Sequence, residues 1–297
     1  MAPTVAAKDV EVTCVLEARA TLGECPVWDE RSQTLHFVDI EAPALFQFDP
    51  KLGAVKRWEM PSRIGCFALD RAGGAVLALA TGFAHFAFAG GALTPIANPL
   101  EGTADHRFND GAVDPGGRFW SGSMHLSTRR PSGRLYCLEG GAARPVFDGF
   151  FVPNGLVWSP DGARFYFNDS PRAMFVSEFD AASGRAGAPY VFADVSAAPG
   201  YPDGTAVDAE GYLWSARWDG HGIARFAPDG RLDRFVPMPV SRPTSCAFGG
   251  PGLDRLYVTS ARKGLDAATL AREPLAGGVF AFDPGVKGLP ARRWGGR

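Results

Sequence analysis

The chain has 297 residues, of which 46% are hydrophobic, so it can bury a large core as one all-β domain or as two ordinary domains. Its 30 basic and 32 acidic residues leave a net charge of −2, and no basic run occurs. This balance argues against nucleic acid or an anionic membrane surface as a partner. The expected partner is a small molecule.

The first residues, MAPTVAAKDVEVTC, lack the basic and apolar regions of a secretion signal. No apolar run approaches the roughly 20 residues that cross a bilayer. The sequence therefore predicts a soluble, cytoplasmic protein. The five cysteines are odd in number, widely spaced and never paired as C-x-x-C, which indicates buried thiols rather than disulfides or a zinc-thiolate site.

One short unit recurs along the chain. It consists of an apolar pair, a turn with Asp or Gly, and a hydrophobic strand. Its six copies begin at GECPVWDE (23–30), GCFALDRAGG (65–74), NDGAVDPGG (109–117), NGLVWSPDG (154–162), DGTAVDAEG (203–211) and TSCAFGGPG (244–252). The strands that follow read LHFVDI, AVLALATG, RFWSGSMH, RFYFNDS, YLWSARW and RLYVTSAR. No sustained helical pattern interrupts them, so the chain is expected to be all-β.

Each unit continues with further strand-like segments, such as LFQFDPKLGAVKRW (45–58). About four strands per unit is the content of one propeller blade. The sequence thus predicts a six-bladed β-propeller as a single domain over residues 1–297, with a core of about 10–294 and a central channel. Residues 10–20 are expected to pair with the last blade and close the ring. The alternative is a pair of β-sandwiches with accidental similarity.

Aligning the six units on their turns gives six equivalent positions, here called the channel positions: Glu24, Gly65, Asn109, Asn154, Asp203 and Thr244. In a propeller these positions open the innermost strands, so their side chains should surround one end of the channel. Two carboxylates and two amide oxygens would form an all-oxygen site for a divalent cation. Asn or Asp before Gly also makes ordinary turns, but Glu24 is no turn former.

At GECPVW, RFNDGAVD, PNGLVWSPDG, YPDGTAVDAEGYLW and TSARKGL the chain resembles the gluconolactonase, regucalcin and senescence-marker-protein-30 family, from about residue 20 to 285. The resemblance implies a six-bladed propeller with one divalent cation (Ca, Zn, Mn, Mg or Fe) in its channel. It implies Glu24, Asn154 and Asp203 as metal ligands, and Arg107 and Asn109 as substrate contacts. The sequence departs from the family at Cys25, where relatives commonly have Gly or another small residue.

The resemblance also implies a function, the hydrolysis of a small sugar lactone to its aldonic acid. In this interpretation the cation polarises the carbonyl, and Asp203 is the general base for the attacking water. Alternatively, the cation alone activates the water and Asp203 only orients it. His125, in SGSMH, is a secondary substrate-binding candidate, and residues 126–133 form either a lid or a solvated loop.

Two other functions stay open at the level of the sequence. One is an organophosphate-cleaving or paraoxonase-like esterase on the same scaffold, which an apolar pocket would favour. The other is a non-catalytic propeller that binds a cation or another protein. The polar side chains of Arg107, Asn109 and His125 favour a sugar substrate.

Overall fold

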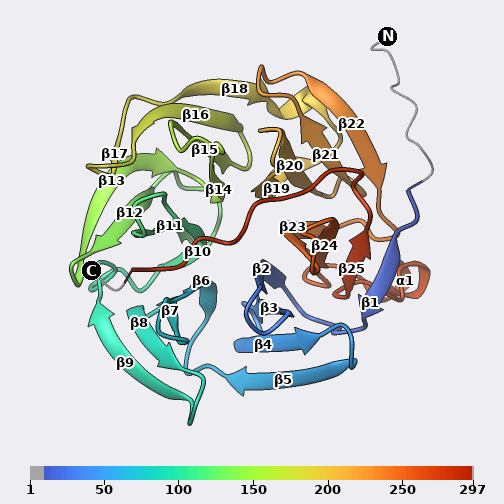
Figure 1. Cartoon of the computed structure of the whole chain (residues 1–297), viewed down its shortest axis with the longest axis horizontal. Coiled ribbons are helices and arrows are strands. Elements are labelled where there is room, and N and C mark those ends of the chain that lie inside the picture. Colours follow the sequence, from blue (N-terminus) through green and yellow to red (C-terminus); the bar gives the residue numbers. More distant parts are fainter. Residues whose placement is uncertain (1–9, 296–297) are drawn as a thin grey trace.

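A computed structural model describes residues 10–295, which form six β-sheets around a central channel (Figure 1). The sheets follow one another in chain order, and the first strands of neighbouring sheets contact each other all the way around the channel. The predicted all-β, six-bladed propeller is confirmed. Positions 1–9 and 296–297, which the predicted domain includes, lie outside the described residues.

The first three blades are four-stranded antiparallel meanders that run from the channel to the rim. Blade 1 contains β2 (Gly23–Asp29), β3 (Thr34–Asp39), β4 (Ala44–Asp49) and β5 (Ala54–Glu59). Blade 2 contains β6 (Ile64–Leu69), β7 (Ala75–Leu79), β8 (Gly82–Ala87) and β9 (Ala92–Ala97). Blade 3 contains β10 (His106–Val113), β11 (Phe119–His125), β12 (Gly133–Glu139) and β13 (Ala142–Phe150). Burial decreases from the channel to the rim: the inner strand β6 is buried throughout, whereas the rim strand β5 is mostly exposed.

Blade 5 keeps this plan, and blades 4 and 6 vary it. Blade 4 has β14 (Pro153–Trp158), β15 (Arg164–Asp169), β16 (Ala173–Asp180) and β17 (Arg185–Ala186), with a fifth strand, β18 (Tyr190–Asp194), also beside β16. The 3-10 helix η1 (Val195–Ala197) follows. Blade 5 contains β19 (Tyr201–Val207), β20 (Leu213–Trp218), β21 (Gly222–Phe226) and β22 (Leu232–Pro237). Blade 6 begins with β23 (Pro243–Gly249) and β24 (Arg255–Ser260), and helix α1 (Ala267–Arg272) precedes β25 (Val279–Phe282). Among residues 10–295 no helix is long and apolar enough to span a bilayer.

The ring is closed by a strand from the other end of the chain. β1 (Thr13–Leu16) pairs antiparallel with β25 and completes blade 6 (Figure 1). The closing strand expected within residues 10–20 is thereby confirmed. Closure leaves no open edge between the first and last blades.

A buried carboxylate holds the turn in the third and the fifth of the six units. Asp114 and Asp208 each accept a backbone N–H from four residues further along, at 2.9 Å. The second oxygen of each accepts the indole N–H of Trp120 (3.0 Å) or Trp214 (2.9 Å). The carboxylate therefore ties the turn to the next strand of the same blade, and the spacing from Asp to Trp recurs because the geometry recurs.

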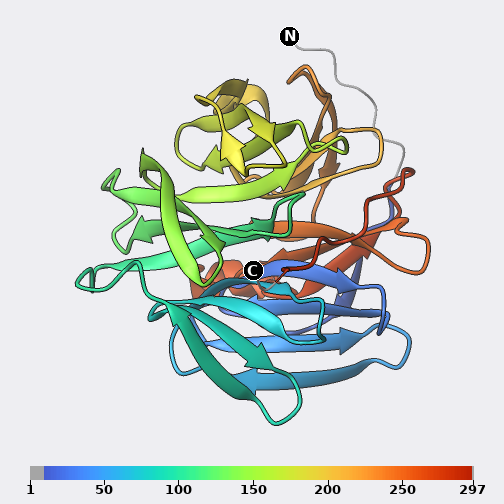
Figure 2. The same cartoon turned by 60° about the vertical axis from the view of Figure 1, so that its left-hand side comes forward.

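Neighbouring sheets lie face to face, as the rotated view in Figure 2 shows. Aromatic side chains fill the spaces between them. Trp120 of β11 meets Trp158 of β14 edge to face with ring centroids 5.8 Å apart, and Phe165 stacks on Trp158 at 4.6 Å. Such contacts bury large apolar areas and fix how the blades are placed around the channel.

The segment after β25 crosses one end of the channel (Figure 1). A β-bridge joins Gly288 to Asp208, and a second joins Trp294 to Asp70. Residues 289–292 line a cavity of ≈ 440 Å³ at the end where the inner strands finish. The C-terminal segment thus covers that end, and the channel positions stand at the opposite one.

His36 of β3 is expected to make the fold sensitive to acid. It is buried against Phe88, with ring centroids 5.2 Å apart, and within residues 10–295 its Nδ1 has no hydrogen-bond partner. Burial lowers the pKa of His36 from 6.5 to about 4. The unfolded chain, with a His pKa of about 6.5, therefore binds the extra proton first, and stability falls as pH drops from about 6.5 toward 4.

The variant His36→Phe removes the imidazole that binds this proton and keeps an aromatic ring at position 36. Its loss of unfolding free energy between pH 7 and pH 5 should be smaller than in the parent protein by about 2 kcal/mol, measured by urea denaturation. The exposed His221 provides the control, since His221→Asn should keep the parental pH dependence. Equal losses in His36→Phe and in the parent would contradict the prediction.

Candidate active site

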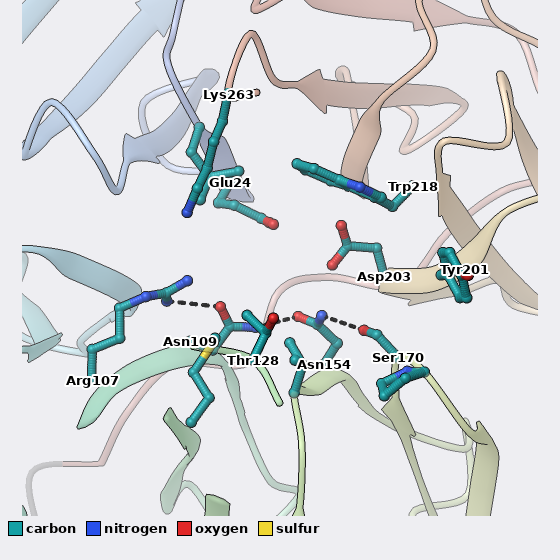
Figure 3. Close-up of a pocket in the computed structure, with 14 residues that line it drawn as sticks. Glu24, Arg107, Asn109, Thr128, Asn154, Ser170, Tyr201, Asp203, Trp218 and Lys263 are labelled. Atoms are coloured by element: carbon teal, nitrogen blue, oxygen red, sulfur yellow. Dashed lines mark hydrogen bonds between the residues drawn. The ribbon is translucent and has the colours of Figure 1, made fainter. Parts of the chain in front are cut away.

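A cavity of ≈ 330 Å³ opens at the end of the channel where the inner strands begin. This size suits a small ligand. Polar and apolar groups share its wall (Figure 3), which is formed by Leu22, Glu24, Arg107, Asn109, Met124, Thr128, Val152, Asn154, Ser170, Pro171, Tyr201, Asp203, Trp218 and Lys263. The structure thus brings together five of the six predicted site residues, from four different blades.

An irregularity in each inner strand aims these side chains into the channel. The pairing of β2 with β3 shifts register just after Glu24, and that of β14 with β15 shifts just after Asn154. The other four inner strands shift at the corresponding place. Bulges re-aim side chains in this way. Cys25 has a φ of 49° in blade 1, as Gly155 has 60° in blade 4, which explains why a small residue suits position 25.

Two channel positions do not reach the cavity. Gly65 lies against the backbone of blade 3, where an added Cβ would come within 2.5 Å of the carbonyl oxygen of Asn109. Thr244 is fully buried and its hydroxyl donates to the carbonyl of Gly23. These two positions join neighbouring blades and leave the other four to form the site.

A chain of hydrogen bonds fixes the orientation of both amides (Figure 3). Arg107 Nη1 donates to Asn109 Oδ1 at 2.8 Å, Asn109 Nδ2 donates to Asn154 Oδ1 at 2.7 Å, and Asn154 Nδ2 donates to Ser170 Oγ at 2.8 Å. Because a guanidinium can only donate, each amide must turn its oxygen toward the arginine side. The Asn154 oxygen keeps a second lone pair for a ligand in the cavity.

Glu24 and Asp203 are each only 6% exposed, and within residues 10–295 neither forms an ion pair. Burial, and then the charges of Asp203 and Asp110, raise the pKa of Glu24 well above its usual value. Burial and then Asp110 do the same for the pKa of Asp203. Such a pair is costly without a compensating cation.

The donor set fits a hard divalent cation. It combines the carboxylates of Glu24 and Asp203 with the amide oxygen of Asn154, and Ca²⁺, Mg²⁺, Mn²⁺ and Zn²⁺ with retained water all accept such oxygen ligands. No three His, Cys, Asp or Glu side chains gather as a metal site in the described part of the chain. The amide of Asn154 would supply the third donor.

Asp110 holds the backbone next to the site through hydrogen bonds. Its Oδ1 accepts from the backbone N–H of Gly111 and its Oδ2 from that of Gly155, both at 2.7 Å. The second bond holds the residue next to Asn154 in place. Burial raises the pKa of Asp110 to about 6. The sequence analysis did not single out this carboxylate, although it stands within the N-D-G motif.

His125 lies outside the cavity wall. Its Nε2 contacts Asp105 Oδ2 at 2.9 Å and its Nδ1 contacts Ser127 Oγ at 2.8 Å. Its neighbour Met124 and, in the loop that follows, Thr128 do reach the cavity. His125 holds the start of the 126–133 loop and does not line the cavity. Its contact with the substrate stays a prediction.

Several wall residues were missed by sequence reasoning, among them four with polar or aromatic side chains. Ser170, Tyr201, Trp218 and Lys263 belong to loops or strand ends outside the repeated turn. Trp218 and Tyr201 lie beside Asp203, and Lys263 lies above Glu24 in Figure 3. Tyr201 opens the YPDG segment two residues before a channel position, and Lys263 stands in the TSARKGL motif, but neither motif assigned these side chains to the site.

Comparisons with known proteins agree with the motifs. The SMP-30/gluconolactonase/LRE-like region matches residues 22–262. The 6-deoxy-6-sulfogluconolactonase of Pseudomonas putida is 38% identical over 93% of this chain and 95% of its own length. Regucalcin of Gallus gallus is 37% identical over 95% of this chain and 97% of its own.

Solved structures share the architecture. A calcium-binding protein, regucalcin, of Agrobacterium tumefaciens superposes with a TM-score of 0.92 at 29% identity, covering 96% of this chain and 97% of that one. A gluconolactonase of Xanthomonas campestris gives a TM-score of 0.76 at 22% identity, covering 93% and 90%, and at that identity it supports the fold alone. With the family model spanning most of the chain, this protein belongs to the SMP-30/gluconolactonase/LRE-like family.

Proposed function

We propose that this protein is a sugar lactonase, a hydrolase that uses one divalent cation to open a small aldonolactone to the aldonic acid. The observation that carries the proposal is the cavity itself. Two buried carboxylates, neither of which forms an ion pair within residues 10–295, face an oriented amide oxygen in a space of ≈ 330 Å³. The Pseudomonas putida relative, named a sulfogluconolactonase, supports the reaction class, and the calcium-binding Agrobacterium neighbour supports a cation.

The residues divide the work of ester hydrolysis among them. Glu24, Asn154 and Asp203 would hold the cation. When bound, it supplies a Lewis acid for the lactone carbonyl. Asp203 accepts the proton of the attacking water. Arg107 and Asn109 bind sugar hydroxyls, and Trp218 offers an apolar face to the ring carbons.

Two other functions compete for the same cavity. An esterase for apolar substrates would use the apolar part of the wall, which includes Leu22, Met124 and Val152, but it gives no role to the charged and amide groups that also line the cavity. A non-catalytic cation binder would need the carboxylates but has no use for Arg107, which is buried beside them and hydrogen-bonded to Asn109. A cytoplasmic location remains the expectation drawn from the sequence.

Metal removal tests the proposal. After exhaustive chelation, with elemental analysis confirming the loss of metal, hydrolysis of glucono-lactone should fall to the spontaneous rate, and a divalent cation should restore it. Measuring Ca²⁺, Mg²⁺, Mn²⁺ and Zn²⁺ separately identifies the preferred ion. Full activity in the metal-free protein would refute the cation requirement, and tight cation binding without turnover of any lactone would establish the non-catalytic alternative.

A further inference from the structure

The active-site cavity continues into a second, strongly basic one. A space of ≈ 440 Å³ shares Arg107, Met124, Thr128 and Lys263 with the first cavity. Its further wall includes Arg63 and Glu41. Three positive side chains therefore face one carboxylate, which leaves an excess of two positive charges at the mouth of the site.

Glu41 is shared by two of these cations. Its Oε2 accepts from Arg63 Nε at 2.9 Å, and its Oε1 accepts from Lys263 Nζ at 2.5 Å. The loop that carries Glu41 is fixed by Asp39, whose Oδ1 accepts the backbone N–H of Glu41 at 3.1 Å. The Glu41 carboxylate thus lies between two basic side chains, at a place that favours an anion.

Arg107 extends the basic group into the reaction chamber. It is 5% exposed, and within residues 10–295 only its Nη1 donates to protein groups, so the other donors are free to meet a ligand. The charges of Glu41, Glu24 and Arg63 all act on the guanidinium of Arg107. In Figure 3, Arg107 and Lys263 both point toward the space next to Glu24.

We propose that the preferred substrate is a lactone that carries a sulfonate or phosphate group remote from its carbonyl, bound by Lys263, Arg63 and Arg107 in place of the Glu41 carboxylate. This inference rests on the proposed lactonase function and adds the chemical class of the substrate. Tetrahedral oxyanions match the fixed donors of guanidinium groups and the point charge of an ammonium. The ion pairs of Glu41 with Arg63 and with Lys263 are partly exposed. Such pairs contribute little free energy, so an incoming anion displaces the Glu41 carboxylate at small cost.

The test compares three substrates that differ only at the exocyclic carbon. These are a neutral glucono-lactone, the same ring with a sulfonate and the same ring with a phosphate. The readout is the selectivity ratio, kcat/KM for each anionic lactone divided by kcat/KM for the neutral one. In the holoenzyme this ratio should exceed about 10, should decrease with added salt, and the better of the two anions identifies the natural group.

Lys263→Met and Arg63→Met should each lower the selectivity ratio at least tenfold, mainly through KM for the anionic lactone. Glu41→Gln, which removes the competing charge and keeps an acceptor oxygen, should raise the ratio at least threefold. The exposed pair of Arg57 and Glu59 provides matched controls, since Arg57→Met and Glu59→Gln should leave the ratio unchanged.

Each outcome bears on one proposal. A ratio below one in the holoenzyme, a ratio within twofold of the parental value in both Lys263→Met and Arg63→Met, or a fall in Glu41→Gln would overturn the anionic substrate while leaving the lactonase function intact. Absence of hydrolysis with all three lactones in the metal-loaded protein would instead overturn the proposed function.

Discussion

Asp203→Asn is expected to lower kcat for lactone opening at least about 100-fold, the usual scale for loss of a general base. The amide keeps an oxygen toward the cation site but cannot take a proton from water. Asp203 combines the required features, since it lies in the cavity wall, is buried, and forms no ion pair within the described residues. The measurement is kcat at saturating lactone and saturating cation, with cation occupancy determined on the same sample.

The control is Asp219→Asn at the exposed partner of Arg242, which should keep the parental kcat. A near-normal kcat in fully cation-loaded Asp203→Asn would remove Asp203 as the base. Its remaining role would then be to hold the cation and orient the water.

Glu24→Gln is expected to weaken cation binding at least about 100-fold. The substitution removes one of the two negative charges of the donor set, and ligand charge strongly tunes the affinity of oxygen sites. Substitution of residues that only hydrogen-bond to metal ligands already lowers metal affinity or activity by about 10–100-fold. Direct titration by calorimetry measures the effect, and catalytic activity should be recoverable at high cation concentration.

The folded state gives an independent readout for this variant. After burial, the charge of Asp203 is the next cause that raises the pKa of Glu24, so the two carboxylates repel each other in the cation-free protein. Glu24→Gln should therefore not lower the Tm of the cation-free protein, while the rise in Tm on adding cation should shrink. Glu139→Gln, at an exposed partner of Arg118, should change neither value. Parental affinity in Glu24→Gln would exclude Glu24 as a ligand.

The repeat in the sequence is sufficient to locate the four channel positions that line the site. Glu24, Asn109, Asn154 and Asp203 lie far apart in the sequence, but rotational symmetry brings equivalent positions of successive blades to one axis. The same symmetry placed β1 against the last blade, because a ring of blades needs a final pairing partner. Periodicity is informative here because the inner strands of all six blades surround one channel in the same way.

The parts that escaped prediction are those where symmetry is broken. Lys263 follows β24 in a segment whose equivalent in the other blades is a short turn, and Glu41 and Arg63 stand in loops of blade 1 and its neighbour. These side chains meet because of the paths of their loops, and the loops are not part of the repeated unit. His125 was placed near the pocket by its strand, but the hydrogen bonds to Asp105 and Ser127 decide where the ring lies.

The pairing of β1 with β25 makes the order of synthesis matter. The strand that completes blade 6 leaves the ribosome before every other strand described here, and its partner Val279–Phe282 follows about 260 residues later. Until then β1 has no partner, and blade 1 has only one neighbouring blade on which to pack. The nascent chain therefore carries unpaired strand edges throughout translation, a state that invites association with other chains. Any message truncated before β25 yields a protein that cannot close, however complete its first five blades are.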